Sequence, residues 1–391
     1  MRCLACGERD LVEFADLGDI PVLCGVHYAT ESEALASPLG RMTLAYCGEC
    51  AYVRNVAFDP AALVYDTTMD TNLHHSPAFQ SFSADLVSSL VSRFDLAGKT
   101  ILDIGCGQGE FLRELCHTAG ARGFGYDAMY AGVAGPDESG AHFTTGFAPL
   151  HDPDLPAFDF VTSRHWFEHI DDPYEFLVSL RERAGDRPVC GYVEVPDAGY
   201  DLATAGWEVI YPHVSYFESV SLRRIFERAG WRVTGGGTMF HGMFRFIEFA
   251  TDVAIDATGF ETTPAPETAI RDRQLHAVAG FGDRQLAEVQ RWRTTIDTLS
   301  RDGGRPVLWG AGSRGVQFLT FADPHRQLAA VVDVNPRKWG RYLPMTAHQV
   351  LSPDVLREIQ PRTVIITNPA YQDEIGKSLS DLGVAAEILT A

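Results

Sequence analysis

The sequence lacks long hydrophobic runs. No apolar stretch approaches the roughly 18 residues that a membrane-spanning helix requires. The N-terminal stretch MRCLACGERD contains no apolar signal region, and no internal repeat or low-complexity tract is visible. The sequence therefore predicts a cytoplasmic protein without a membrane partner.

Basic residues are also scarce. The chain has 32 Lys and Arg against 52 Asp and Glu, which gives a net charge of −20. Such a surface repels phosphate backbones and anionic lipid, so we expect no nucleic-acid partner. A local arginine cluster that holds one small phosphorylated ligand stays possible, and solubility alone is the simplest explanation of the charge.

The remaining composition is that of a multidomain globular enzyme or binding protein. A chain of 391 residues is too long for one ordinary core, and it is 46% hydrophobic and 21% charged. From Lys99 onward short apolar strands alternate with helices, which predicts an α/β fold with parallel sheets covered on both faces. We expect an N-terminal domain (1–60), a Rossmann-like central domain with a helical lead-in at 76–94 (61–250), an irregular linker over 252–280 followed by a long helix (251–303), and a smaller, doubly wound Rossmann-like domain (304–391).

Four of the eight cysteines form two Cys-x-x-Cys pairs, Cys3 with Cys6 and Cys47 with Cys50. In a reducing compartment paired cysteines favour metal binding over disulfides. Two pairs complete a tetrahedral zinc site with no open coordination position, so we expect a structural rather than a catalytic zinc. Two unrelated pairs, or a redox dithiol that needs only one of them, are the alternatives.

The stretch ILDIGCGQGEF predicts a cofactor loop. A buried strand ends at Asp103, and a loop with Gly105, Gly107 and Gly109 leads into a helix. Glycines let a ligand approach the backbone, and the helix start offers free amide groups. The loop lacks the Gly-Lys-Ser/Thr of a phosphate-binding P-loop. The next strand ends in Asp127, where an acid can bind ribose hydroxyls, so the pattern predicts S-adenosylmethionine.

With this loop the sequence resembles the class I S-adenosylmethionine-dependent methyltransferases. More closely, it resembles the three-domain, zinc-containing sugar C-methyltransferases of deoxysugar and antibiotic biosynthesis, over nearly the whole chain. The similar stretches are LHHSPAF (73–79), SRHWFEHI (163–170), VEVPD (193–197), IYPHVSYF (210–217) and WGAGSRG followed by VVDVNPRKWG. The resemblance implies a zinc-binding N-terminal domain, a central methyltransferase sheet and methylation of a carbon beside a ketone on a nucleotide-linked sugar.

The resemblance also assigns catalytic roles. C-methylation beside a ketone requires a base for the α-proton and a donor for the enolate oxygen. Where the family has a motif like Tyr-Glu-His, this chain has Tyr211-Pro212-His213, so the glutamate is missing. We expect His213 to be the general base and Tyr211 a hydroxyl donor, with His241 of a His-Gly pair at the oxyanion. Ordinary burial of His213, aromatic packing of Tyr211 and surface exposure of His241 are the alternatives.

Other polar residues lie near the expected site. Ser76 precedes a helix start, where it either contacts the methionine end of the cofactor, together with His74 and His75, or caps the helix. His165 is expected to flank the cofactor or substrate. Three further residues have structural or active-site roles as alternatives: Glu168, His169 and Glu194.

A second glycine loop raises a rival function. Gly310, Gly312 and Gly315 have dinucleotide-fingerprint spacing, and Asp333 ends the next strand. A NAD-type enzyme, or a noncatalytic ligand-binding or redox module, therefore competes with methyl transfer. O- or N-methylation of a natural product on the same scaffold is a further alternative. Residues that could meet a phosphate at this end are Ser313, Arg314, Arg337 and Lys338.

Overall fold

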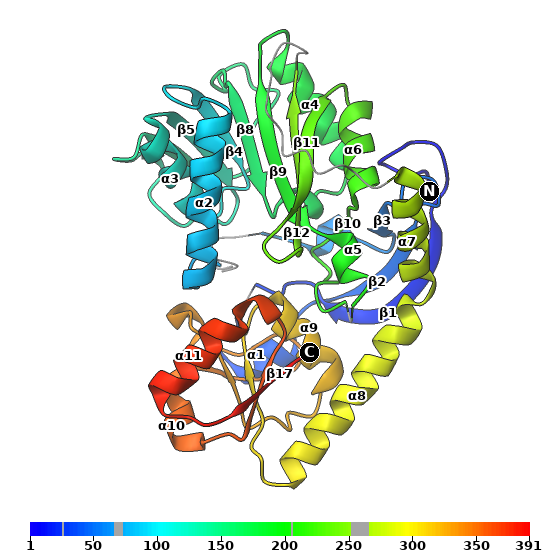
Figure 1. Ribbon diagram of the computed structural model, residues 1–391, viewed down its shortest axis with the longest axis vertical. Coiled ribbons are helices and arrows are strands. Elements are labelled where there is room, and N and C mark those ends of the chain that lie inside the picture. The colour runs from blue at the N-terminus through cyan, green and yellow to red at the C-terminus, as the bar shows by residue number, and fades with distance from the viewer. Residues whose placement is uncertain (26, 66–72, 205, 252–265) are drawn as a thin grey trace.

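The computed structural model describes residues 1–25, 27–65, 73–204, 206–251 and 266–391. The described residues form three sheets, of four, eight and five strands. Figure 1 shows the eight-stranded sheet above the five-stranded one, with the N-terminal sheet beside both.

The N-terminal sheet is antiparallel and has the order β1-β2-β3-β10. Its fourth strand lies far along the chain and pairs with β3, so it joins this sheet to the central domain. The short helix α1 lies instead against the C-terminal domain, where Tyr28 pairs with Tyr342 and the Met345 amide donates to the Ala34 carbonyl at 2.8 Å. The elements are β1 (Val12–Pro21), α1 (Glu31–Leu35), β2 (Leu39–Tyr46), β3 (Val53–Asn55), η1 (Pro60–Ala62) and β10 (Ser215–Tyr216).

The central sheet has the order β11-β12-β9-β8-β4-β5-β7-β6. Strands β7, β5, β4, β8 and β9 are parallel, and antiparallel strands complete both edges. Helices α2 and α3 cover one face and α4 and α6 the other (Figure 1), as expected for alternating β and α units. The elements are α2 (Pro77–Arg93), β4 (Thr100–Ile104), α3 (Glu110–Ala119), β5 (Arg122–Asp127), β6 (Gly135–Pro136), β7 (Ala141–Thr145), β8 (Phe160–Arg164), η2 (Phe167–His169), α4 (Pro173–Ala184), β9 (Cys190–Pro196), α5 (Ala198–Asp201), α6 (Ser219–Arg228), β11 (Arg232–Met239) and β12 (Phe244–Ala250).

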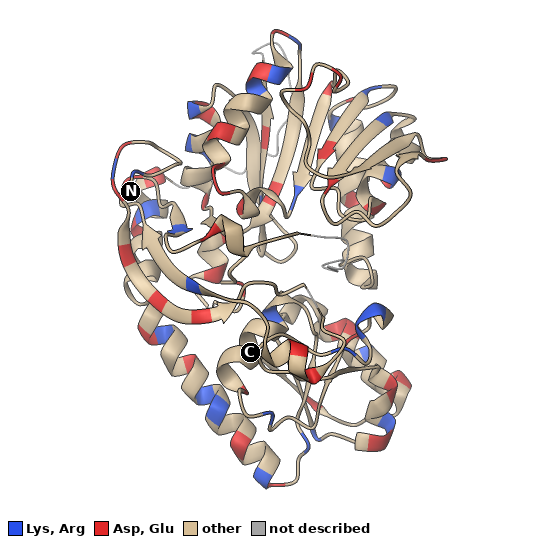
Figure 2. Ribbon diagram, turned by 180° about the vertical axis from the view of Figure 1, so that it is seen from behind, with Lys and Arg blue, Asp and Glu red and all other residues tan. Residues whose placement is uncertain are grey.

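Two helices connect the central and C-terminal domains. The expectation of an irregular segment over 252–280 is wrong for its second half, where α7 (Glu267–Ala279) forms; residues 252–265 lie outside the described residues. Its buried positions have helical spacing, but one is a glutamine and another an alanine, so the apolar signal is weak. The expected long helix is α8 (Phe281–Arg301), along which acidic and basic residues are interspersed (Figure 2).

The C-terminal domain is a parallel five-stranded sheet with the order β15-β14-β13-β16-β17. Within the ranges that the structure describes, no helix has both the length and the apolar character needed to cross a membrane. The elements of the domain are β13 (Val307–Trp309), α9 (Ser313–Ala322), β14 (Ala330–Val332), η3 (Pro336–Lys338), β15 (Val350–Leu351), η4 (Pro353–Val355), α10 (Leu356–Ile359), β16 (Thr363–Ile366), η5 (Pro369–Tyr371), α11 (Gln372–Leu382) and β17 (Glu387–Thr390).

Candidate active site

The first glycine loop joins β4 to α3 at the carboxyl edge of the central sheet. Gly105, Gly107 and Gly109 have φ angles of 76°, 56° and 88°. A Cβ on Gly105 would lie 2.3 Å from Cγ of Trp166, so this glycine is required by packing. A Cβ on Gly107 would meet nothing within 4 Å, so the middle of the loop faces open space. The N-cap of α3 is Gly109, which has no side chain that could cap the first turn, so the start of this helix suits a ligand.

The two predicted aspartates lie at the ends of neighbouring strands. Asp127 accepts hydrogen bonds from the amides of Gly107 at 2.8 Å and Met129 at 2.7 Å, so it fastens the loop to β5. Asp103 is 3% exposed, and burial raises its pKa to about 7 even though Arg164 opposes the shift. These groups fit a ligand with amino and ribose hydroxyl groups, which is what S-adenosylmethionine presents.

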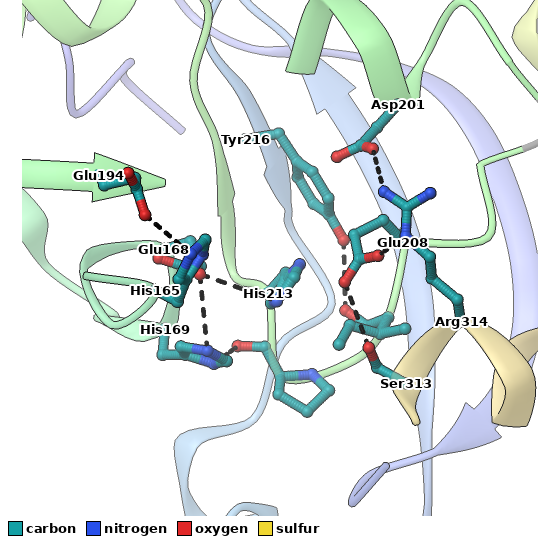
Figure 3. Close-up of polar contacts among 12 residues, drawn as sticks. His165, Glu168, His169, Glu194, Asp201, Glu208, His213, Tyr216, Ser313 and Arg314 are labelled. Atoms are coloured by element: carbon teal, nitrogen blue, oxygen red, sulfur yellow. Dashed lines mark hydrogen bonds and ion pairs between the residues drawn. The ribbon is translucent and has the colours of Figure 1, made fainter. Parts of the chain in front are cut away.

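A buried carboxyl group faces two imidazoles in front of this edge (Figure 3). Glu168 Oε1 lies 3.9 Å from His213 Nε2 and 3.8 Å from His169 Nε2. The Nδ1 atom of His169 lies 2.9 Å from both the Pro212 carbonyl oxygen and the Tyr65 hydroxyl. Because a carbonyl only accepts, we assign the His169 proton to Nδ1, so the Nε2 lone pair faces Glu168.

Burial sets the charges of this cluster. It lowers the pKa values of His169 and His213 to about 3, so both rings are neutral near pH 7. It also raises the pKa of Glu168 well above its usual range, with help from Glu208, Glu194 and Asp201. His213 Nδ1 and Glu168 Oε2 are buried and have no hydrogen-bond partner among the residues that the structure describes. The ligand atoms lie within 4.8 Å of one another, a space that a proton or a small cation can occupy.

His165 belongs to a second polar group. Its Nε2 lies 3.0 Å from Glu194 Oε1, and its ring packs edge-on against Phe244 with centroids 4.3 Å apart. Glu194 also binds Arg164 at 3.0 Å and accepts from the Tyr192 hydroxyl at 2.8 Å. Burial alone would raise the pKa of Glu194, but Arg164 and His165 lower it to about 2. The φ angle of His165 is 53°, which is a strained left-handed conformation for a residue other than glycine. The surrounding structure must therefore stabilise this conformation at the carboxyl edge of the central sheet.

Three predicted site residues lie elsewhere. The Tyr211 hydroxyl accepts from the Asp59 amide at 2.8 Å, so the structure does not bring it to His213, and its expected donor role has no geometric support. Ser76 caps α2 and donates to Glu374 Oε2 at 2.6 Å, so its hydroxyl is engaged away from a cofactor. His241 is exposed at the turn between β11 and β12 with a φ of 60°.

The structure adds residues that the sequence reasoning did not select. Tyr65 contacts His169, Arg164 pairs with Glu194, and Glu208 binds the C-terminal domain. Only Tyr65 carried a local signal, as an aromatic residue shortly before the LHHSPAF stretch. The other contacts depend on tertiary structure.

The four expected zinc ligands come together. Cys3 Sγ lies 3.5 Å from Cys50 Sγ, and Cys6 Sγ lies 3.7 Å from Cys47 Sγ, with all four sulfur atoms within 4.8 Å of one another. A tetrahedral ion with Zn–S bonds of about 2.3 Å separates its sulfur ligands by about 3.8 Å. The cluster therefore fits one zinc ion. These cysteines would hold it without an open position for catalysis.

The second glycine loop is packed closely at Gly315, whereas a Cβ on Gly310 or Gly312 would meet nothing within 4 Å. A Cβ on Gly315 would lie 2.1 Å from the Gly310 carbonyl oxygen, so this glycine serves close packing. Asp333 accepts from the Ala311 amide at 2.7 Å, as Asp127 does from the first loop, but it also accepts from Lys338 Nζ at 3.0 Å. The ion pair with Lys338 disfavours a ribose contact at Asp333, and this is the geometric argument against the NAD-type alternative.

Comparison with known protein families supports a cofactor site at the carboxyl edge of the central sheet. Residues 79–235 match a family described as a methyltransferase domain, and residues 254–386 match the C-methyltransferase C-terminal domain. The chain is thus a class I S-adenosylmethionine-dependent methyltransferase. More particularly, it is one that carries a C-methyltransferase C-terminal domain.

Two similar solved structures each cover a little less than half of the chain. A methyltransferase from Aquifex aeolicus is 17% identical, over 46% of this chain and 95% of its own, with a TM-score of 0.34. Magnesium protoporphyrin IX methyltransferase from Synechocystis with bound S-adenosylhomocysteine is 19% identical, over 45% and 84%, with a TM-score of 0.34. A search of curated proteins found no match.

Proposed function

We propose that the enzyme methylates a carbon beside a ketone of a nucleotide-linked deoxysugar, with His213 as the general base. The observation that carries the proposal is the buried, neutral His213 imidazole facing Glu168, in a chain with a C-methyltransferase C-terminal domain. A neutral imidazole has the lone pair that proton removal requires.

We assign cofactor binding to the glycine loop between β4 and α3. The glycine loop and the start of α3, together with Asp103 and Asp127, would hold S-adenosylmethionine, which supplies an electrophilic methyl group on a sulfonium. The loop brings this donor to the same sheet edge as η2, which carries Glu168 and His169. Pre-positioning of the two reactants accounts for much of such a reaction's acceleration.

The proton transfer is assigned to His213 and Glu168. His213 would take the α-proton, and bound S-adenosylmethionine would supply the methyl group to the carbanion, with the electron pair of the broken carbon–sulfur bond left on sulfur. The imidazolium that forms is stabilised by Glu168 as a carboxylate, in the manner of a histidine–carboxylate pair. Glu168 thereby provides a carboxyl group close to His213, in place of the glutamate of the family motif, whose position is occupied by Pro212 in this chain. The apo distance of 3.9 Å is expected to shorten with substrate bound.

Deuterium exchange tests the base without requiring methyl transfer. With S-adenosylhomocysteine bound, the enzyme should wash solvent deuterium into the carbon beside the ketone of a nucleotide-linked keto sugar. The His213→Ala variant should exchange at least about 100-fold more slowly, whereas the exposed His117→Ala variant should match the wild type. Undiminished exchange by His213→Ala would remove the base assignment, and methylation without any exchange would instead indicate O- or N-methylation.

A further inference from the structure

The segment from Trp207 to His213 connects all three sheets. Trp207 packs edge-on against Phe318 of α9 with ring centroids 5.3 Å apart, and the Val209 carbonyl accepts from Gln317. Farther along, Tyr211 enters the N-terminal core and the Pro212 carbonyl binds a histidine of the central domain. The position of His213 is therefore fixed through contacts that lie outside the central sheet.

The strongest of these contacts is made by Glu208. Its carboxylate accepts from Ser313 Oγ at 3.2 Å and pairs with Arg314 Nε, and Arg314 also lies 3.6 Å from Asp201. The side chains of Glu208 and Arg314 are each only 14% exposed. Figure 3 shows His213 lying between this ion pair and the Glu168–His169 group.

Glu208 places a carboxylate at the N-terminal end of α9, where it binds the side chains of Ser313 and Arg314. It meets the first residues of α9, whose N-cap Gly312 has no side-chain cap. The positive end of a helix dipole and its free amides favour an anion there. In this chain the anion is a carboxylate from the central domain, so the loop serves an internal contact.

We propose that the glycine loop of the C-terminal domain positions the base by holding Glu208. Four residues lie between Glu208 and His213, and all four are buried. A misplacement of about 1 Å can cost about 100-fold in rate. Glu208 and Arg314 are thus positioning residues that do not touch the reacting atoms. This inference rests on the proposed function, because it assumes that His213 is the base.

The Glu208→Gln variant tests the proposal. It keeps the shape of the side chain but removes its charge, so we expect deuterium exchange to slow at least tenfold while affinity for S-adenosylmethionine, measured by calorimetry, stays unchanged. Arg314→Lys should give a similar loss, and the double variant should lose less than the product of the two single effects, because both disrupt one contact. Glu288→Gln is the matched control, since Glu288 lines the same cavity of about 430 Å³ but pairs with Arg291 instead.

Histidine side-chain NMR separates this proposal from the assignment of the base. The ring ¹⁵N signals of His213 should shift in Glu208→Gln but not in Glu288→Gln. Unchanged signals together with wild-type exchange in Glu208→Gln would overturn the positioning role. If His213→Ala retains exchange, the proposed base fails, whereas a shift of the His213 signals in Glu208→Gln would still support the contact that holds the segment.

Discussion

The Glu168→Gln substitution gives the sharpest test of the histidine cluster. Ionised Glu168 and protonated His213 would attract each other by about 4 kcal/mol across 3.9 Å at an effective dielectric constant of about 20. That energy corresponds to about three pKa units of extra basicity for His213. Because only part of this gain appears in a proton-transfer rate, we expect Glu168 to accelerate exchange by roughly 10- to 1,000-fold.

The sign of the pH dependence follows from the raised pKa of Glu168. At low pH its carboxyl group is protonated and adds no charge, and as pH rises through its folded pKa the carboxylate strengthens the base. Wild-type exchange should therefore rise with pH, whereas Glu168→Gln should stay near the low-pH rate of the wild type across the range.

Exchange rates from pH 5.5 to 9 measure this difference. The exposed Glu175→Gln variant on α4 provides a matched control and should follow the wild-type profile. A Glu168→Gln profile that is lowered by the same factor at every pH would refute the electrostatic reasoning and leave Glu168 with a packing role.

Three other predictions follow from the site. Elemental analysis of the purified enzyme should find one zinc ion per chain. The Cys47→Ser variant should lose this ion, and thermal unfolding should show a loss of several kcal/mol of stability. A second zinc ion per chain that disappears in Glu168→Gln would contradict the assignment of His213 as the base. The Cβ of Gly105→Ala would clash with Trp166, so this variant should be destabilised by more than the roughly 1–2 kcal/mol expected for Gly107→Ala. Calorimetry should show weaker cofactor binding in both variants. Equal losses of stability would contradict the packing of Gly105 against Trp166. The folded pKa of His213 is about 3, so below pH 6.5 this residue binds more protons in the unfolded chain than in the folded one. Between pH 6.5 and 5.5 the wild type should therefore lose about 1 kcal/mol more unfolding free energy than His213→Gln, as measured by denaturant unfolding. Equal losses in the two proteins would mean that His213 is not buried as a neutral ring.

The cofactor loop and the cysteine cluster were predictable because their signals are local. Glycines at fixed spacing between a strand and a helix specify the backbone path directly, and Asp127 follows at the end of the next strand. Two Cys-x-x-Cys pairs likewise need only one further condition, that the two turns meet. The alternation of strands and helices predicted the α/β class for the same reason.

The histidine cluster was only half predictable. The sequence motif indicated His213, but its partner Glu168 lies 45 residues earlier and is brought there by η2. Adjacency in sequence favoured Tyr211, yet that side chain lies in the N-terminal core, and Tyr65 contacts the cluster instead. The helix α7 was missed because tertiary packing stabilises it more than its own apolar pattern does.

The pairing of Tyr28 with Tyr342 has a consequence for biosynthesis. The neighbouring contact between Arg341 and His27 spans 314 residues, so the segment around His27 is synthesised long before the segment that it contacts. At about 5–20 residues per second, the early segment waits for roughly 15–60 s before that contact can form. Truncation of the chain before Tyr342 would therefore leave the segment around α1 without its docking surface, even if the zinc cluster and central sheet had already assembled.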